Sequence, residues 1–114
     1  MSIRLELDEV AAAITERGAA CFLTTVGRDG RPKIVHVNAS HDGTNITVVC
    51  GRGSALNAQD RPLVTLLWPR VADQKLHLLI DGDATVTLAD DDGRDGNTVR
   101  ISPTSAIKHV AVHS

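Results

Sequence analysis

Short apolar segments separated by closely spaced turn sequences are the feature that most limits what this chain of 114 residues can fold into. The turns GRDG at 27–30 and HDGTN at 41–45 carry Asp-Gly pairs, which suit the backbone angles of β-hairpins. The segments of strand length are residues 20–26, 31–40, 46–50, 63–68, 76–88, 99–101 and 106–112. They predict an antiparallel meander of six or seven strands that closes, fully or partly, into a barrel.

Three details refine this prediction. The nearly unbroken apolar run at 63–68 predicts a strand covered on both faces. Asp81-Gly82 lies in the middle of the longest segment, where a missing side chain lets a strand bend or bulge. Pro103 predicts an interruption between the last two segments, and residues 89–97 are expected to form a polar loop.

Two helices are expected besides the strands. Apolar residues recur at helical spacing from Leu7 to Ile14, with Asp8 as the candidate N-cap and Gly18 as the stop. A short polar segment between Ser54 and Pro62 predicts a second helix after the third strand. The chain is therefore predicted to form one mainly β (α+β) domain over residues 1–114.

Composition narrows the classes of function. A net charge of -2, a pI near 6.2, and a content of one Trp, one Phe and no Tyr argue against nucleic-acid binding. The apolar runs are far shorter than the roughly 20 residues of a membrane span, and the charged N-terminal segment lacks the apolar block of a signal peptide. A cytoplasmic protein is expected, with Cys21 and Cys50 as reduced core thiols rather than a disulfide.

The stretch VVCGRGSALN, residues 48–57, carries the strongest sign of a ligand site. Gly51 and Gly53 let the backbone approach a ligand, Ser54 is expected to cap the following helix, and Arg52 adds a guanidinium suited to phosphate oxygens. A phosphate-bearing ligand is one interpretation, and a glycine-rich surface turn with an ordinary helix cap is the other. The Rossmann and Walker patterns are not found in this stretch.

The order of these segments resembles the flavin-binding split-barrel family, the relatives of pyridoxamine 5'-phosphate oxidase. The resemblance covers the N-terminal helix and most of the chain after it. It is carried by the stretches CFLTTVGRDGRPKIVHV, VVCGRGSALN, RPLVTLLWP, LLIDGDATV and SPTSAIKH. It implies a six-stranded antiparallel split β-barrel with an N-terminal helix and a short helix after the third strand. It also implies a homodimer that holds FMN in a groove between its subunits.

The resemblance also assigns site residues by position. Val49, Cys50 and Gly51 would line the ring and ribityl edge of the flavin, and Trp68 would reach the cofactor of the partner subunit. The residues expected around the phosphate are Lys33, Arg52, Gly53, Ser54 and Asn57. Many relatives have a serine followed two positions later by a lysine in this turn, where this chain has Arg52 and Ser54. That departure leaves open FMN, the related deazaflavin coenzyme, or no bound cofactor.

Other residues are weaker candidates for chemistry. His36 and His41 should face opposite sides of a strand, so they are not expected to share a metal. His36 is interpreted as an edge histidine, with a role in lining the groove as the alternative. His109 and His113 lack an acidic or Cys partner, and Asp90, Asp91, Asp92 and Asp95 depart from the ligand spacing of a calcium loop. Ser54 lacks the GxSxG setting of a hydrolase. No metal site is predicted.

Two hypotheses of function follow. The first is a homodimeric flavoprotein whose FMN exchanges a hydride with a small-molecule substrate, with no catalytic side chain assigned. The second is a noncatalytic protein on the same barrel that binds or carries a flavin-like, deazaflavin or other phosphorylated ligand. A dimer would in addition cover the apolar side chains of Leu66, Leu67 and Trp68.

Overall fold

The computed structural model describes residues 2–70, 76–89 and 96–110. The described strands are β1 (Ser2–Leu5), β2 (Ala20–Val26), β3 (Pro32–His41), β4 (Ile46–Cys50), β5 (Leu63–Trp68), β6 (Leu76–Thr87) and β7 (Asn97–Val110). The helices are a 3-10 turn (Leu7–Glu9), α1 (Val10–Arg17) and α2 (Arg52–Asp60). Three strands, β2, β4 and β5, have the bounds that the sequence predicts.

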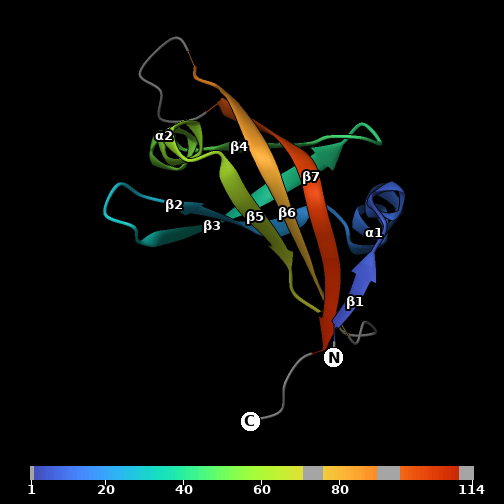
Figure 1. Cartoon of the computed structure of the whole chain (residues 1–114). Helices are drawn as coiled ribbons and strands as arrows, with labels where there is room; N and C mark the ends of the chain where they lie inside the picture. Colours follow the sequence, from blue (N-terminus) through green and yellow to red (C-terminus); the bar gives the residue numbers. More distant parts are fainter. Residues whose placement is uncertain (1, 71–75, 90–95, 111–114) are drawn as a thin grey trace.

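Six strands close into an antiparallel barrel (Figure 1). Their order is β7-β4-β3-β2-β5-β6, and β6 pairs again with β7 to complete the circle. β1 lies outside this circle and pairs with β7. The two helices lie on opposite sides of the barrel, with α1 beside β1 and α2 packed against β2, β6 and β7 (Figure 1). The expected mainly β split barrel with two short helices is confirmed.

β7 holds the barrel together because it has three partner strands. One of its edges pairs with β6 along nearly its whole length. The other edge pairs first with β4, through residues 97–101, and then with β1, through residues 106–109. β1 itself was not predicted, because four residues of which the first three are exposed carry no alternation signal.

Pro103 does not interrupt β7, contrary to the sequence-based expectation. It lies opposite Gly82, where the register between β6 and β7 shifts and the hydrogen-bond ladder is locally broken. A residue without an N–H group can occupy such a bulge, so the strand continues through it. The expected end of this segment at residue 112, and the centre of the polar loop expected at 89–97, lie outside the described residues.

β5 is covered on one face rather than on both. Val64, Leu66 and Trp68 are buried, whereas Leu63 is 72% exposed. An antiparallel barrel has a single interior, so an apolar run within it still alternates in burial. Leu66 and Trp68 are therefore covered by the chain's own core, and of the three residues expected beneath a second subunit only Leu67 points outward.

The start of the first helix also differs from the expectation. Asp8 is not the N-cap, because the chain enters a 3-10 turn one residue earlier. The backbone N–H of Glu6 there donates to Oε1 of Glu9 at 2.9 Å. Gly18 ends α1 as predicted, with a φ of 89°. In the described part of the chain, no helix is long and apolar enough to cross a membrane.

Candidate functional site

The barrel is split along one edge of β3. β2 pairs with β3 along residues 32–38, but β4 pairs with it only at residues 39–41. Among the described strands, none pairs with the second edge of residues 32–38, because β4 pairs with β3 only as far as Val48 and the chain turns into α2 after Cys50. The backbone N–H and C=O groups on this edge are available to a ligand, as they are on any edge strand.

A groove of about 290 Å³ lies between this free edge and the end of β4. Five of the residues that the sequence singled out line it: Lys33, Val49, Cys50, Gly51 and Ser54. The other three lining residues, Val35, His36 and Val37, come from β3. Val49 is 56% exposed, which leaves an apolar side chain free for contact in the groove.

The N-terminus of α2 forms one end of this groove. Gly51 is its N-cap, with extended backbone angles, and among the described side chains none caps it by a hydrogen bond. The first backbone bond of the helix runs from the N–H of Ala55 to the carbonyl of Gly51. The N–H groups of Arg52, Gly53 and Ser54 come before that bond, at the positive end of the helix dipole.

Ser54 does not cap the helix as predicted. It is the third residue of α2 and only 1% exposed, and the N-cap is Gly51, so the helix begins three residues earlier than expected. Ser54 still lines the groove. The glycine at the N-cap position explains the difference, because Gly is itself accepted there and leaves the first N–H groups open.

Lys33 brings a positive charge to the same end. A Cβ built on Gly53 would lie 2.7 Å from Nζ of Lys33, so the ammonium group lies directly beside the Cα of Gly53. Gly53 therefore leaves the space that the lysine occupies. An ammonium group and a helix N-terminus that meet in this way form an anion-binding arrangement.

The remaining groups of the groove do not oppose an anion. None of its eight lining residues is Asp or Glu. Burial raises the pKa of the Cys50 thiol above its usual value, and the nearby charge of Lys33 acts in the opposite direction. Burial also raises the pKa of Cys21 to about 12. Both thiols are free and buried, so they remain protonated and uncharged near neutral pH.

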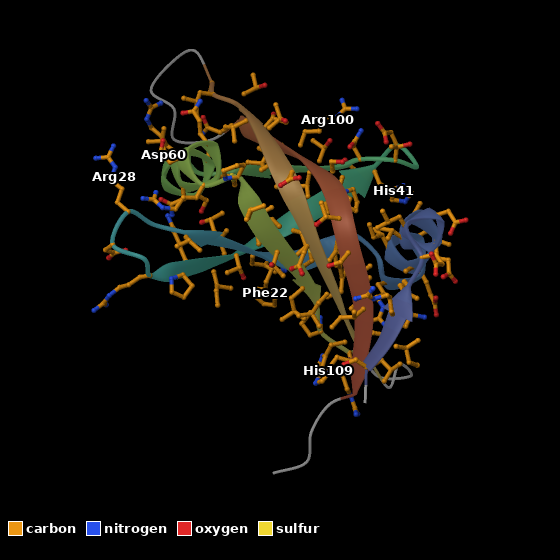
Figure 2. The ribbon with its side chains drawn as sticks, viewed as in Figure 1. Phe22, Arg28, His41, Asp60, Arg100 and His109 are labelled. Carbon is orange, nitrogen blue, oxygen red and sulfur yellow. The ribbon has the colours of Figure 1, made fainter. Side chains whose placement is uncertain are left out.

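Gly53 and Asn57 line a second, neighbouring groove of about 600 Å³. Its wall carries both signs of charge, because Nε of Arg28 lies 3.9 Å from Oδ2 of Asp60 (Figure 2). Asn57 uses its amide Nδ2 to donate to Oγ1 of Thr25 at 3.2 Å. That bond ties α2 to β2, which gives Asn57 a structural role at the border of the two grooves.

Arg52 and Trp68 lie outside the lining of both grooves. Arg52 is exposed on the first turn of α2. Trp68 is 1% exposed, and its indole N–H donates to the carbonyl of Gly18 at 3.0 Å. Within one subunit this ring is part of the core and does not border either groove.

The histidines occupy separate places. His41 lies beside α1, where its Nε2 is 2.9 Å from Oγ1 of Thr15 (Figure 2). His36 is exposed on β3 and lines the smaller groove. Within the described ranges, no three side chains of His, Cys, Asp or Glu gather to hold a metal ion. His113 and the acidic cluster at 90–95 lie outside the described residues.

Sequence reasoning missed one residue of this region and gave too little weight to another. A groove-lining role was only the alternative interpretation of His36, because nothing in the sequence shows that β4 leaves β3 before reaching it. Asn97 is fully buried; its Nδ2 donates to the carbonyl of Cys50 at 3.3 Å, and its Oδ1 accepts from the N–H of Ala89 at 3.0 Å. It holds the end of β4 in place, but a lone Asn after a polar loop gives no local signal.

Comparisons with known proteins agree with this architecture. Neither a protein-family model nor a curated protein matches the sequence. Solved structures match over most of the chain. A relative of general stress protein 26 from Clostridium acetobutylicum, of the pyridoxinephosphate oxidase family, has a TM-score of 0.69 at 14% identity, with 94% of this chain and 90% of that chain covered.

Two further solved structures with the same fold have names that state functions different from each other. An F420 reductase has a TM-score of 0.68 at 17% identity, with coverage of 82% of this chain and 93% of its own. HutZ, a heme storage protein from Vibrio cholerae, has a TM-score of 0.69 at 15% identity, with coverage of 94% and 98%. At these identities the likeness shows the fold, and it confirms the resemblance to the pyridoxamine 5'-phosphate oxidase-like split barrels at that level.

Proposed function

We propose that this split-barrel protein binds FMN in the groove beside β3 and acts as a flavin-dependent oxidoreductase on a small-molecule substrate. The observation that carries the proposal is the ammonium group of Lys33 beside Gly53, at a helix N-terminus with open N–H groups. This end of the groove suits a phosphate. When bound, the flavin supplies the hydride chemistry, and the protein supplies binding and orientation.

The other lining residues suit the rest of such a ligand. The free N–H and C=O groups of β3 can pair with the polar edge of a planar ring, as they would with a neighbouring strand. Val35, Val37 and Val49 offer apolar contact, and covering Val49 would remove an exposed apolar side chain from water. No catalytic side chain is assigned, because the hydride transfer belongs to the cofactor.

The related deazaflavin coenzyme is the alternative ligand. It too carries a phosphate, and one structural neighbour is an F420 reductase. The anion-binding end of the groove is suited to either molecule, so the choice rests on the ring end. Competition of the deazaflavin coenzyme against bound FMN measures which of the two this groove prefers.

Added FMN should lose its fluorescence on binding, whereas riboflavin should bind at least about tenfold more weakly because it lacks the phosphate. A fluorescence titration of both ligands at the same ionic strength tests this. Equal affinities would show that the phosphate makes no net contribution. Absence of quenching by either ligand would contradict the proposal.

A noncatalytic carrier is the second candidate, and two observations favour it. The eight lining residues of the groove include no carboxylate, and a heme storage protein shares the fold. Steady-state reduction of a suitable acceptor by a nicotinamide donor through the bound flavin distinguishes the two. Turnover supports the oxidoreductase, and tight binding without turnover supports the carrier.

We also propose that the protein is a homodimer. A row of cross-strand neighbours on the outside of the barrel consists of Phe22, Leu67, Leu79 and Ile107. Each is partly exposed, while the preceding residue in each of the four strands is buried in the core. His36 continues this row and lines the groove, so a second subunit seated on the row would also reach the groove.

Leu67→Glu should convert the dimer into monomers, because it places a charge in the middle of this apolar row. Sedimentation velocity at micromolar concentration measures the change. Ile3→Glu is the matched control: Ile3 is 47% exposed, but it pairs with Lys108 and points to the opposite face of the sheet. A monomeric wild-type protein would overturn the proposal. The two buried, free thiols suit a reducing compartment such as the cytoplasm, where we place this protein.

A further inference from the structure

The side chain of His36 on β3 borders the groove and also contacts the neighbouring strand β2. It lines the groove, and its ring packs against Phe22, its direct cross-strand neighbour on β2. The ring centroids are 5.3 Å apart and the planes are tilted by 58°. This is the range of favourable contacts between aromatic rings, and it limits how the imidazole can turn. The imidazole is thus held at the groove by a neighbour that is not itself a lining residue.

His36 follows Lys33 by three residues on β3, so their Cα atoms lie about 10 Å apart at about 3.3 Å per residue. The two side chains leave opposite faces of the strand, and both line the groove along its free edge. Lys33 marks the end where Gly53 and the helix N-terminus meet. The groove therefore has the ammonium group of Lys33 beside Gly53 and, three residues further along β3, the imidazole of His36.

The chemistry of His36 differs from that of every other lining side chain. Lys33 can only donate hydrogen bonds, the valines can neither donate nor accept, and the Ser54 hydroxyl can do both but carries no charge. An imidazole can donate and accept, and histidine is the side chain whose ordinary charge change falls between pH 5 and 8. The titratable groups that share the groove with it are Lys33 and Cys50, and Phe22 covers its side toward β2.

From this arrangement we propose that His36 is a positioning residue, which donates a hydrogen bond to the ring end of a ligand whose phosphate lies beside Lys33. The inference rests on the proposed function, since it assumes one ligand that spans both ends. It makes the groove selective for molecules that carry a hydrogen-bond acceptor as well as a phosphate. Protonated His36 adds a second positive charge, so such a ligand binds more tightly as the pH falls.

The test compares two probes, FMN and inorganic phosphate. His36→Ala should weaken FMN by about tenfold, the value of one hydrogen bond to a charged group, and should change phosphate affinity less than about twofold. Lys33→Met should weaken both probes. FMN is followed by fluorescence and phosphate by amide chemical shifts. His77→Gln is the control, because His77 is a histidine on β6 outside the groove.

A pH series separates positioning from a structural role. The ratio of wild-type to His36→Ala affinity for FMN should be larger at pH 6 than at pH 8. His36→Gln, which can still donate, should recover part of the affinity at pH 8 but none of the gain at pH 6. A ratio that does not change with pH would overturn the inference, as would an equal loss of FMN and phosphate binding.

Failure of the two proposals can be told apart. Wild-type protein that binds FMN with the same affinity as His36→Ala would overturn only the role of His36. Wild-type protein that binds phosphate but not FMN would overturn the flavin proposal, and this inference with it.

Discussion

Replacing Lys33 with methionine is expected to weaken FMN binding by about 10- to 100-fold, or about 1.5 to 3 kcal/mol, the value of a hydrogen bond to a charged group. Methionine keeps most of the length of the side chain and removes its ammonium group, which lies beside Gly53 at the start of α2. The loss should therefore come from the charge rather than from packing. Isothermal titration with FMN at fixed ionic strength measures it.

Arg52→Ala is the comparison for this prediction. The sequence favoured Arg52 as the main phosphate ligand, but its side chain is exposed on the first turn and outside the lining of the groove. Its removal should cost less affinity than the removal of Lys33. Riboflavin, which has no phosphate, should bind both variants like the wild type. A larger loss of FMN affinity for Arg52→Ala than for Lys33→Met would indicate that the phosphate binds on the outer side of the turn.

Gly82→Ala is expected to lower the free energy of unfolding by about 3 kcal/mol, the upper part of the range for overpacked cores. A Cβ at this position would lie 2.5 Å from Cγ2 of Ile101 and 2.7 Å from the backbone carbonyl oxygen of Ser102. Part of this clash is with backbone, so a rotamer change cannot relieve it. Urea denaturation followed by circular dichroism measures the loss.

Gly43→Ala serves as the control for Gly82→Ala. Gly43 has a φ of 93° and open space around the position of a Cβ. Its replacement should cost only about 1 kcal/mol, through backbone strain. Equal losses for the two variants would show that the close approach of β6 and β7 at Gly82 is not the cause.

Local chemistry made most of the fold predictable. Gly30 and Gly43 have positive φ angles in the two predicted hairpin turns, and the strands on either side of each turn, β2 with β3 and β3 with β4, pair as expected. The errors occurred where a neighbour far away in sequence decides the outcome. Pro103 fits into β7 only because Gly82 lies opposite it, and β1 forms only because β7 offers an edge. Such pairings leave no trace in a short window of sequence.

The site was predictable to a similar degree. Gly51 and Ser54 line the groove, and Gly53 lies beside the ammonium group of Lys33, because the turn that contains them is itself the site. The position of the helix start was wrong, since Gly51 rather than Ser54 is the N-cap. Which of two basic residues faces the groove depends on how β3 passes α2, and pattern alone cannot decide between Lys33 and Arg52. The hydrogen bonds of Asn97 depend on tertiary contacts in the same way.

The three partners of β7 also have a consequence for how the chain folds. β4, β6 and β1 all precede β7 in the sequence, and Ser2 and His109, which are paired, are separated by 107 positions. The barrel can close only after residues 97–110 are available, so its edges remain open until then. Contacts over such long separations slow folding and leave unpaired strands exposed to other chains. Changes in β7 should therefore affect the yield of refolding more strongly than changes in the β2–β3 hairpin.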